Sequence, residues 1–373
     1  MFYEGISADK MIYFTLYGVT GTVALIATVY LLCRRGNAFA PGVTPPLRLR
    51  RWTAAFFAAA TLSHAWWFFF YLFSCAILST AHIAIAVIDC MTLMITIAGT
   101  LLAMLQDRRR PIWPVIVAMI PIVVLGAALM VSHSAFLFTV LIMLFLSVCL
   151  LFTVYMVVAV RQYNRWLCDN FADLENKRVW LSQLLVISVC LLFVFYTNDD
   201  GNPIKFTVMT ACDLLLFCLL LWRVETLPQL TVVPQSEQTE QTGQQEQAGV
   251  EPVPVSDIEL PPVERLLAAH CVATKLYLQH ELTLAQLAKA LGSNRTYLSH
   301  YFSSKGTTYN AYINDLRIDY FVCRYREAVA NGQTVTAQQL ANESGYRSYS
   351  TFSLAFKQRM GQSVTAWMRS VAP

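Results

Sequence analysis

Charged side chains are scarce in this chain of 373 residues. Asp, Glu, Lys and Arg together make up 13% of it, whereas apolar residues make up 56%. A typical soluble domain carries about 25% charged residues, and a disordered chain has a low apolar content. The composition therefore excludes an intrinsically disordered protein and a conventional soluble enzyme, and it indicates a large membrane part.

Linear motifs of catalysis and metal binding are also missing. The apolar part of the chain has no HExxH, GxSxG or Walker sequence and no paired catalytic carboxylates. Most of the ten cysteines fall in apolar runs, and Cys271 and Cys323 lie too far apart in sequence for a zinc pattern. We therefore predict that the protein is not an enzyme, with no catalytic residue, no cofactor and no bound metal.

The few charges are distributed unevenly along the chain. Residues 1–223 hold almost all long apolar runs and carry 15 basic against 10 acidic residues. Residues 224–261 are rich in Gln and Pro and carry seven acidic residues but no basic one, and residues 262–373 carry 12 basic against six acidic residues. The sequence therefore predicts a polytopic membrane domain, a disordered acidic linker and a basic soluble domain.

The membrane domain contains several runs long enough to cross a bilayer. A membrane-spanning helix needs about 20 apolar residues, and seven segments meet this requirement. They are residues 11–33, 52–73, 83–105, 112–131, 135–160, 179–196 and 206–222. We therefore predict a bundle of seven transmembrane helices.

Positive charge predicts the orientation of these helices, because cytoplasmic loops carry an excess of Lys and Arg. With the N-terminus outside, the inner loops hold 13 positive charges and the outer segments hold only Lys10 and Lys205. An odd number of crossings then places the linker and the C-terminal domain in the cytoplasm.

Three ionisable residues fall within the apolar segments, namely His64, Asp89 and Asp213. Ionisable side chains are costly in a membrane and often mark a functional site. One interpretation is a site for a signal ligand or a proton between the helices. The other is a set of hydrogen bonds between helices, to neighbours such as Ser63 and Thr92.

Apolar spacing and cap residues predict that the C-terminal domain is helical throughout. The expected helices cover residues 263–279, 284–291, 295–304, 309–330, 336–343 and 349–359. This gives an all-α fold class for the whole chain.

One pattern occurs twice in this domain: a small residue, a glycine turn, and two apolar residues spaced four apart in a second helix. It is found at Ala288, Gly292, Leu298 and Phe302, and again at Ala341, Gly345, Phe352 and Phe356. This is the geometry of a helix-turn-helix, whose second helix enters the major groove of DNA. Two helix-turn-helix motifs joined by one long helix are therefore expected.

The segments LTLAQLAKALGSNRTYLSHYF, YINDLRI and QQLANESGYRSYSTFSLAFKQRMGQSVTAW carry a resemblance to a known family. Residues 263–367 resemble the DNA-binding domain of AraC/XylS transcription regulators. Two departures are a loop at residues 303–306 that is one residue shorter than usual, and Val364 in place of the usual proline. The membrane half looks like that of membrane-bound members from Bacteroidetes-type bacteria.

The resemblance implies which residues contact DNA. Solvent-facing positions of the two recognition helices would read bases, and these are Arg295, Thr296, Ser299 and His300 in the first helix and Tyr349, Ser350, Thr351, Ser353 and Leu354 in the second. Arginine can bind guanine in the major groove, whereas leucine can only meet a thymine methyl group, so readout should be stronger from the first helix. Phosphate contacts are expected from Arg347, Lys357 and Arg359.

Together these features predict a membrane-anchored one-component transcription regulator in the bacterial inner membrane. The expected partners are double-stranded promoter DNA, membrane lipid, RNA polymerase, an unidentified signal ligand and a second copy of the chain in a homodimer. The alternative is a membrane transporter or receptor whose cytoplasmic helical tail binds a partner protein.

The orientation can be tested with a reporter enzyme that is active only outside the cytoplasm. Fused after Arg223, the reporter should be silent, because 13 of the 15 positive charges then lie inside. The same reporter fused after Lys205 serves as the control and should be active. The reverse pattern of activities would mean that the topology is inverted.

Overall fold

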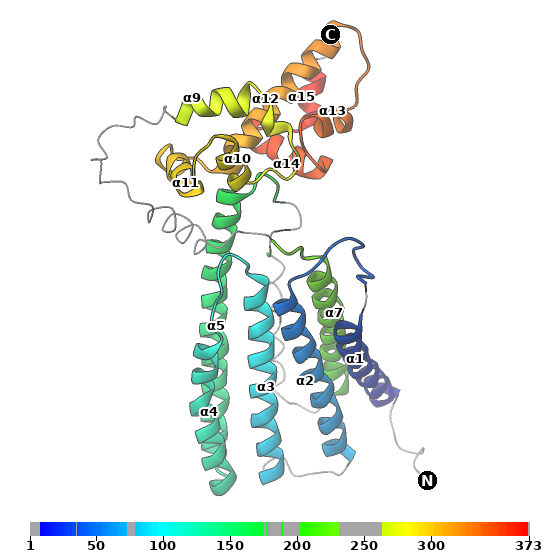
Figure 1. Cartoon of the computed structure of the whole chain (residues 1–373). Coiled ribbons are helices and arrows are strands. Elements are labelled where there is room, and N and C mark those ends of the chain that lie inside the picture. The colour runs from blue at the N-terminus through cyan, green and yellow to red at the C-terminus, as the bar shows by residue number, and fades with distance from the viewer. Residues whose placement is uncertain are drawn as a thin grey trace, which may run out of the picture. The chain divides into compact units, whose positions relative to one another are not determined.

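The computed structural model describes residues 8–34, 36–72, 79–174, 177, 179, 188, 202–230 and 263–371. Every regular element in these ranges is a helix (Figure 1). Extended pairing within them is limited to one isolated antiparallel bridge, between Phe171 and Thr283. The all-α fold class expected from the sequence is therefore confirmed.

The chain divides into two compact units. The first comprises residues 1–163 and 179–230, and the second comprises residues 164–178 and 231–373. The composition of the sequence places residues 164–178 in the membrane domain, whereas the structure groups them with the C-terminal unit.

The first unit is built from long, mainly apolar helices that lie side by side in Figure 1. They are α1 (Ala8–Cys33), α2 (Leu47–Leu72), α3 (Thr80–Met104), α4 (Trp113–Ser132), the first part of α5 (Ala135–Asn170) and α7 (Pro203–Thr226). Helix α1 packs on α2 and α7, α2 packs on α3, and α3 packs on α4. Buried Met94, Met119 and Phe145 join α3, α4 and α5.

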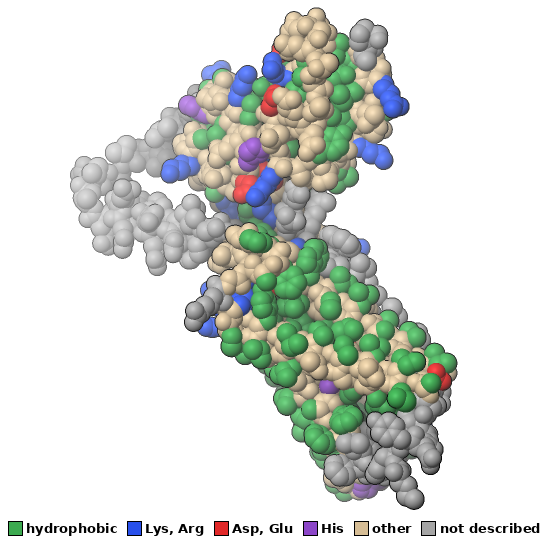
Figure 2. Space-filling view, turned by 90° about the vertical axis from the view of Figure 1, so that its right-hand side faces the viewer, with side chains coloured by type: hydrophobic (Ala, Val, Ile, Leu, Met, Phe, Trp, Pro, Cys, Tyr) green, Lys and Arg blue, Asp and Glu red, His purple; other side chains and the backbone are tan. Residues whose placement is uncertain are grey.

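Many large apolar side chains of this unit point outward, including Val131, Phe136 and Leu151, which are 86%, 74% and 69% exposed. Figure 2 shows hydrophobic side chains covering the visible face of these helices. A surface of this kind is unfavourable in water and is typical of helices that face lipid. The first unit is therefore suited to a membrane environment.

Five described helices are long and apolar enough to cross a membrane: α1, α3, α4, α5 and α7. The sequence predicts seven transmembrane helices, whereas five helices in the described part of the chain meet the requirements of length and apolar character. Helix α2 is not in this set; it begins with Arg48, Arg50 and Arg51 and carries His64 within its apolar run. The segment expected at residues 179–196 lies outside the described residues, apart from positions 179 and 188.

Helix α5 is ten residues longer than the expected segment, which ended at residue 160. Its 36 residues correspond to roughly 54 Å at about 1.5 Å per residue. The hydrocarbon core of a bilayer measures only about 30 Å. The polar C-terminal turns of α5 therefore extend beyond an apolar layer of that thickness.

The second unit contains short helices around one long helix. They are α9 (Val263–Leu267), the π-helical turn η1 (Ala268–Val272), the 3-10 turn η2 (Leu276–Leu278), α10 (Leu284–Ala290), α11 (Arg295–Ser304), α12 (Tyr309–Ala330), α13 (Ala337–Glu343), α14 (Tyr349–Met360) and α15 (Val364–Val371). The continuous helix expected over residues 263–279 is interrupted, because Lys275 adopts a left-handed conformation with φ 53°.

Polar caps fix where the main helices of this unit begin. In α10, α11, α12, α13 and α14 the preceding side chain accepts a hydrogen bond from the backbone N–H three residues further on. These caps are Thr283, Asn294, Thr308, Thr336 and Ser348. Such a bond satisfies a backbone donor that the helix itself cannot pair. The start of each helix is thus encoded locally in the sequence.

The repeated sequence pattern forms two separate apolar cores. Leu287, Ala288, Leu298 and Phe302 lie in the first, and Leu340, Ala341, Phe352 and Phe356 lie in the second. Helix α12 contributes to both, with Tyr309 and Ile313 in the first core and Ile318 and Phe321 in the second. The arrangement of two helix-turn-helix motifs on one long helix is therefore confirmed.

Phe352 should be essential for the second core. It is fully buried, and its ring centroid lies 4.5 Å from that of Phe321 and 5.6 Å from that of Phe356. Truncating a core Phe to Ala costs about 3–5 kcal/mol, out of a total of roughly 5–15 kcal/mol for a domain. Phe352→Ala should therefore increase hydrogen exchange throughout α14 in the full chain.

The matched control is Leu354→Ala, on the same helix, because Leu354 is 52% exposed. A surface substitution of this kind usually changes stability by less than about 0.5 kcal/mol, so exchange in α14 should stay at the wild-type rate. Equal effects of the two substitutions would mean that the buried face of α14 is assigned wrongly.

Candidate nucleic-acid interface

The first recognition helix, α11, has one buried and one accessible face. Leu298 and Phe302 point into the first core. Of the residues predicted to contact DNA, Thr296 and His300 are exposed, and Arg295 and Ser299 are half-buried. The structure therefore leaves these four polar side chains accessible on the face opposite the core, as a helix that enters a groove requires.

Arg295 is the first residue of α11, directly after the cap residue Asn294. Partial burial lowers the pKa of its guanidinium, because burial disfavours the charged form. A cation at this end of a helix is unfavourable, because the N-terminus carries a partial positive charge. A phosphate or a guanine acceptor nearby would compensate both effects, so the position of Arg295 suits a contact with DNA.

The second recognition helix, α14, offers fewer accessible polar groups. Ser350 is exposed, whereas Tyr349, Thr351 and Ser353 are half-buried. The ring of Tyr349 packs 5.9 Å from that of Phe352, and the hydroxyl groups of Ser350 and Thr351 each lie 3.0 Å from the Ser348 hydroxyl. Several of these side chains thus also support the start of the helix, and α14 has less hydrogen-bonding capacity for bases than α11.

The three cations expected to bind phosphate have different surroundings. Lys357 is exposed on α14. Arg347 forms an ion pair with Glu281, in which both side chains are more than half exposed. Exposed ion pairs contribute about 0–1 kcal/mol, so Arg347 can exchange this carboxylate for a phosphate at little cost.

Arg359 is held more tightly than the sequence suggested. Its guanidinium pairs with Asp319 on α12 at 2.7 Å and with Asp315 at 3.1 Å. Two carboxylates already neutralise this cation, and they link α14 to α12. The structure therefore favours a role for Arg359 in positioning α14 rather than in phosphate binding.

The ionisable residues of the first unit are engaged in local bonds. Asp89 on α3 accepts hydrogen bonds from Ser63 Oγ and from Trp67 Nε1 on α2, both at 2.8 Å. Thr92, the other neighbour considered, donates instead to the backbone carbonyl of Asp89. The carboxylate therefore connects two helices, which agrees with the structural interpretation of this residue.

His64 lies where three helices meet. Its Nδ1 donates to the carbonyl of Ala60 at 2.8 Å, and its ring lies 4.6 Å from that of Tyr17 on α1. Phe217 on α7 is 6.3 Å from the same ring, and Asp213 precedes Phe217 by one helical turn, on the same face of α7. His64 and Asp213 thus belong to one region between α1, α2 and α7.

Metal binding has no support in the residues that the structure describes. No three His, Cys, Asp or Glu side chains in these ranges come together as ligands.

Comparisons with known proteins locate the DNA-binding part. A family model for a helix-turn-helix domain, of AraC type, matches residues 287–370, from α10 to α15. Comparison with curated proteins and with solved structures gives no match. The match covers most of the first helix-turn-helix motif and the whole of the second, which supports a DNA-binding role for the C-terminal region.

A substitution at Arg295 tests the interface. Arg295→Ala should leave the helical circular dichroism unchanged but weaken binding to the genomic DNA fragment that the wild-type chain selects. Loss of one arginine–base contact costs about 1–3 kcal/mol, which is about 5- to 150-fold in affinity.

Arg324→Ala is the matched control for net charge, since Arg324 is an exposed cation on α12 paired with Glu327. It should reduce affinity much less than Arg295→Ala. An unfolded Arg295→Ala protein, or equal losses of affinity in the two variants, would contradict the assignment of the DNA-binding face.

Proposed function

We propose that this protein is a membrane-anchored, sequence-specific transcription regulator of the one-component kind. Helices in the bacterial inner membrane sense a signal, and the C-terminal domain binds promoter DNA in the cytoplasm. The observation that carries this proposal is the presence, in one chain, of a helix-turn-helix domain of AraC type and five helices apolar enough to cross a membrane. The protein acts by binding and not by catalysis.

The DNA contacts follow from the two recognition helices. Arg295, Thr296, Ser299 and His300 read bases from α11, and Tyr349, Ser350, Thr351 and Ser353 read them from α14. Arg347 and Lys357 bind phosphate groups and fix the register of the domain on the duplex. RNA polymerase and a second copy of the chain are the protein partners of this complex.

The location of residues 164–178 supports a cytoplasmic C-terminus. They belong to the same compact unit as the DNA-binding domain, so they lie on the same side of the membrane. The chain must then cross an even number of times between residue 178 and residue 231. Helix α7 supplies one crossing, and the other is the one that the sequence predicts at residues 179–196.

Helix α2 completes the topology. If it did not cross while residues 164–178 stay in the cytoplasm, Arg34, Arg48, Arg50 and Arg51 would lie outside, against the positive-inside rule. With α2 and residues 179–196 included, the chain crosses seven times and has its N-terminus outside. The region around His64, Asp89 and Asp213 is the place where a signal ligand would bind within this bundle.

The proposal predicts DNA binding by the full chain in lipid nanodiscs, with a steep dependence on salt. Each phosphate neutralised by Lys or Arg releases counterions, so a protein with about 6–10 such contacts loses roughly 10³–10⁵ in affinity between 50 and 200 mM salt. Genomic fragments captured by the chain can be titrated at several salt concentrations.

Chains carrying Arg295→Ala serve as the control, because they should capture the same fragments less well. Affinity that does not change with salt, or capture of a partner protein without any DNA, would overturn the proposal and favour a transporter or receptor with a protein-binding tail.

A further inference from the structure

Helix α12 carries a fully buried positive charge, Arg317. Its Nε donates to the carbonyl of Tyr277 at 2.7 Å and its Nη2 to the carbonyl of Gln279 at 2.8 Å. These carbonyls satisfy hydrogen bonds but supply no negative charge. A buried cation is costly unless a counter-ion accompanies it, so the surroundings of Arg317 must include a carboxylate.

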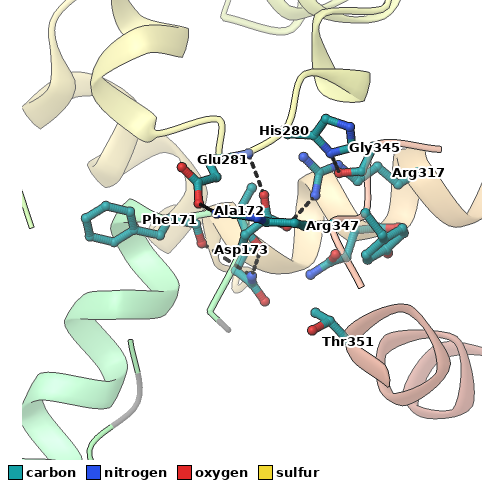
Figure 3. A network of polar contacts seen from close by, with 12 residues as sticks. Phe171, Ala172, Asp173, His280, Glu281, Arg317, Gly345, Arg347 and Thr351 are labelled. Carbon is teal, nitrogen blue, oxygen red and sulfur yellow. Dashed lines mark hydrogen bonds and ion pairs between the residues drawn. The ribbon is translucent and has the colours of Figure 1, made fainter. Parts of the chain in front are cut away.

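That carboxylate belongs to Asp173, which lies far from the DNA-binding domain in sequence. Asp173 Oδ1 is 2.8 Å from Nη1 of Arg317, and the exposed fractions of the two side chains are 7% and 0% (Figure 3). The other oxygen, Oδ2, accepts a hydrogen bond from the backbone N–H of Glu281 at 2.7 Å. In the described part of the chain, this is the ion pair that neutralises Arg317.

The residues before Asp173 are bonded to the same domain. Phe171 forms the antiparallel bridge with Thr283, and the N–H of Ala172 donates to the carbonyl of Leu282 at 3.1 Å. Asn310 Nδ2 donates to the carbonyls of Phe171 and Ala172. Ala172 is 2% exposed and lies in the apolar core of the first helix-turn-helix.

This segment continues directly from a helix of the membrane domain. Phe171 follows the last residue of α5, whose residues 135–163 belong to the first unit. The chain passes between the two units at residues 163–164, 178–179 and 230–231. The linker at residues 224–261 is therefore one of three connections, and the DNA-binding domain is more than a module on a flexible tether.

The Asp173 carboxylate also supports a residue next to the DNA-binding face. Glu281 has a left-handed backbone with φ 56°, which is unfavourable for a residue other than glycine. The bond to Asp173 holds its N–H in this conformation, while its side chain pairs with Arg347. Loss of Asp173 would thus release both Glu281 and a cation that we assign to phosphate binding.

We propose that residues 171–173 are an intrachain docking segment through which the membrane domain holds and controls the DNA-binding domain. Control of DNA binding by this segment rests on the proposed function, whereas the docking itself does not. Asp173 is the positioning residue of this segment. Movement of α5 would pull on the bond to Arg317, and so on α12, which carries residues of both helix-turn-helix cores.

Cleavage of the linker tests the docking. A specific protease site replaces residues 241–246 of the full chain in nanodiscs, and retention of the C-terminal fragment is measured after cutting. The wild-type fragment should remain with the nanodisc. Asp173→Ala should release it at least about tenfold faster, because removing one partner of a buried ion pair leaves the other charge unpaired.

Asp169→Ala is the matched control. Asp169 precedes Asp173 by four residues, and the charge that acts on its carboxylate is that of Arg165, within α5. This variant should retain the fragment as wild type does. Release of the wild-type fragment on cutting, or equal release from both Asp variants, would overturn the proposal.

If circular dichroism shows that Asp173→Ala unfolds the domain, a second variant tests the docking. Asn310→Ala removes the hydrogen bonds to the carbonyls of Phe171 and Ala172 but leaves the Arg317 charge paired. It should release the fragment faster than wild type with the helical signal preserved. Wild-type retention in this variant, together with an unfolded Asp173→Ala protein, would also overturn the proposal.

DNA capture by the uncut chain separates this inference from the proposed function. A retained fragment in a chain that captures no DNA would confirm the docking and refute the regulator. Immediate release from a chain that does capture DNA would refute the docking and leave the regulator in place.

Discussion

The buried charge of Arg317 is the constraint on which the C-terminal unit depends. A guanidinium without access to water needs an acceptor for its N–H groups and a counter-charge. The backbone of residues 277–279 turns its carbonyls towards it, and Asp173 supplies the carboxylate. Gly345 is required for the same reason, since a Cβ there would lie 2.7 Å from the Leu278 carbonyl oxygen and 3.0 Å from Arg317 Nε.

Around this charge the domain contains two copies of the same structural motif. A capped short helix, a glycine turn and a second capped helix enclose a small apolar core, and α12 closes both cores along its length. Tyr346, at the second turn, stacks over Arg317 with 5.3 Å between the guanidinium carbon and the ring centroid. The two motifs are thus connected by apolar packing along α12. Arg317 in addition links the second turn to the backbone of Tyr277 and Gln279, just before the first motif.

Much of this was accessible from the sequence, because the relevant interactions are local. The caps Thr283 and Ser348 act within three residues, and Phe352 and Phe356 lie on one face of a helix simply because they are four residues apart. The accessible face of α11 follows from the same periodicity. Arg359 was interpreted less well, because its partners Asp315 and Asp319 lie about 40 residues earlier in the chain and no spacing rule connects them.

The sequence by itself determined the helical class, the apolar character of the first 223 residues and the two helix-turn-helix motifs, since hydrophobic periodicity and composition report on burial directly. Only the tertiary structure decided that residues 171–173 belong with the DNA-binding domain. In sequence, Asp173 is one acidic residue in a polar loop after an apolar helix, and Arg317 is one cation on a long helix. Their pairing depends on a fold that brings together residues 144 positions apart and excludes water from both.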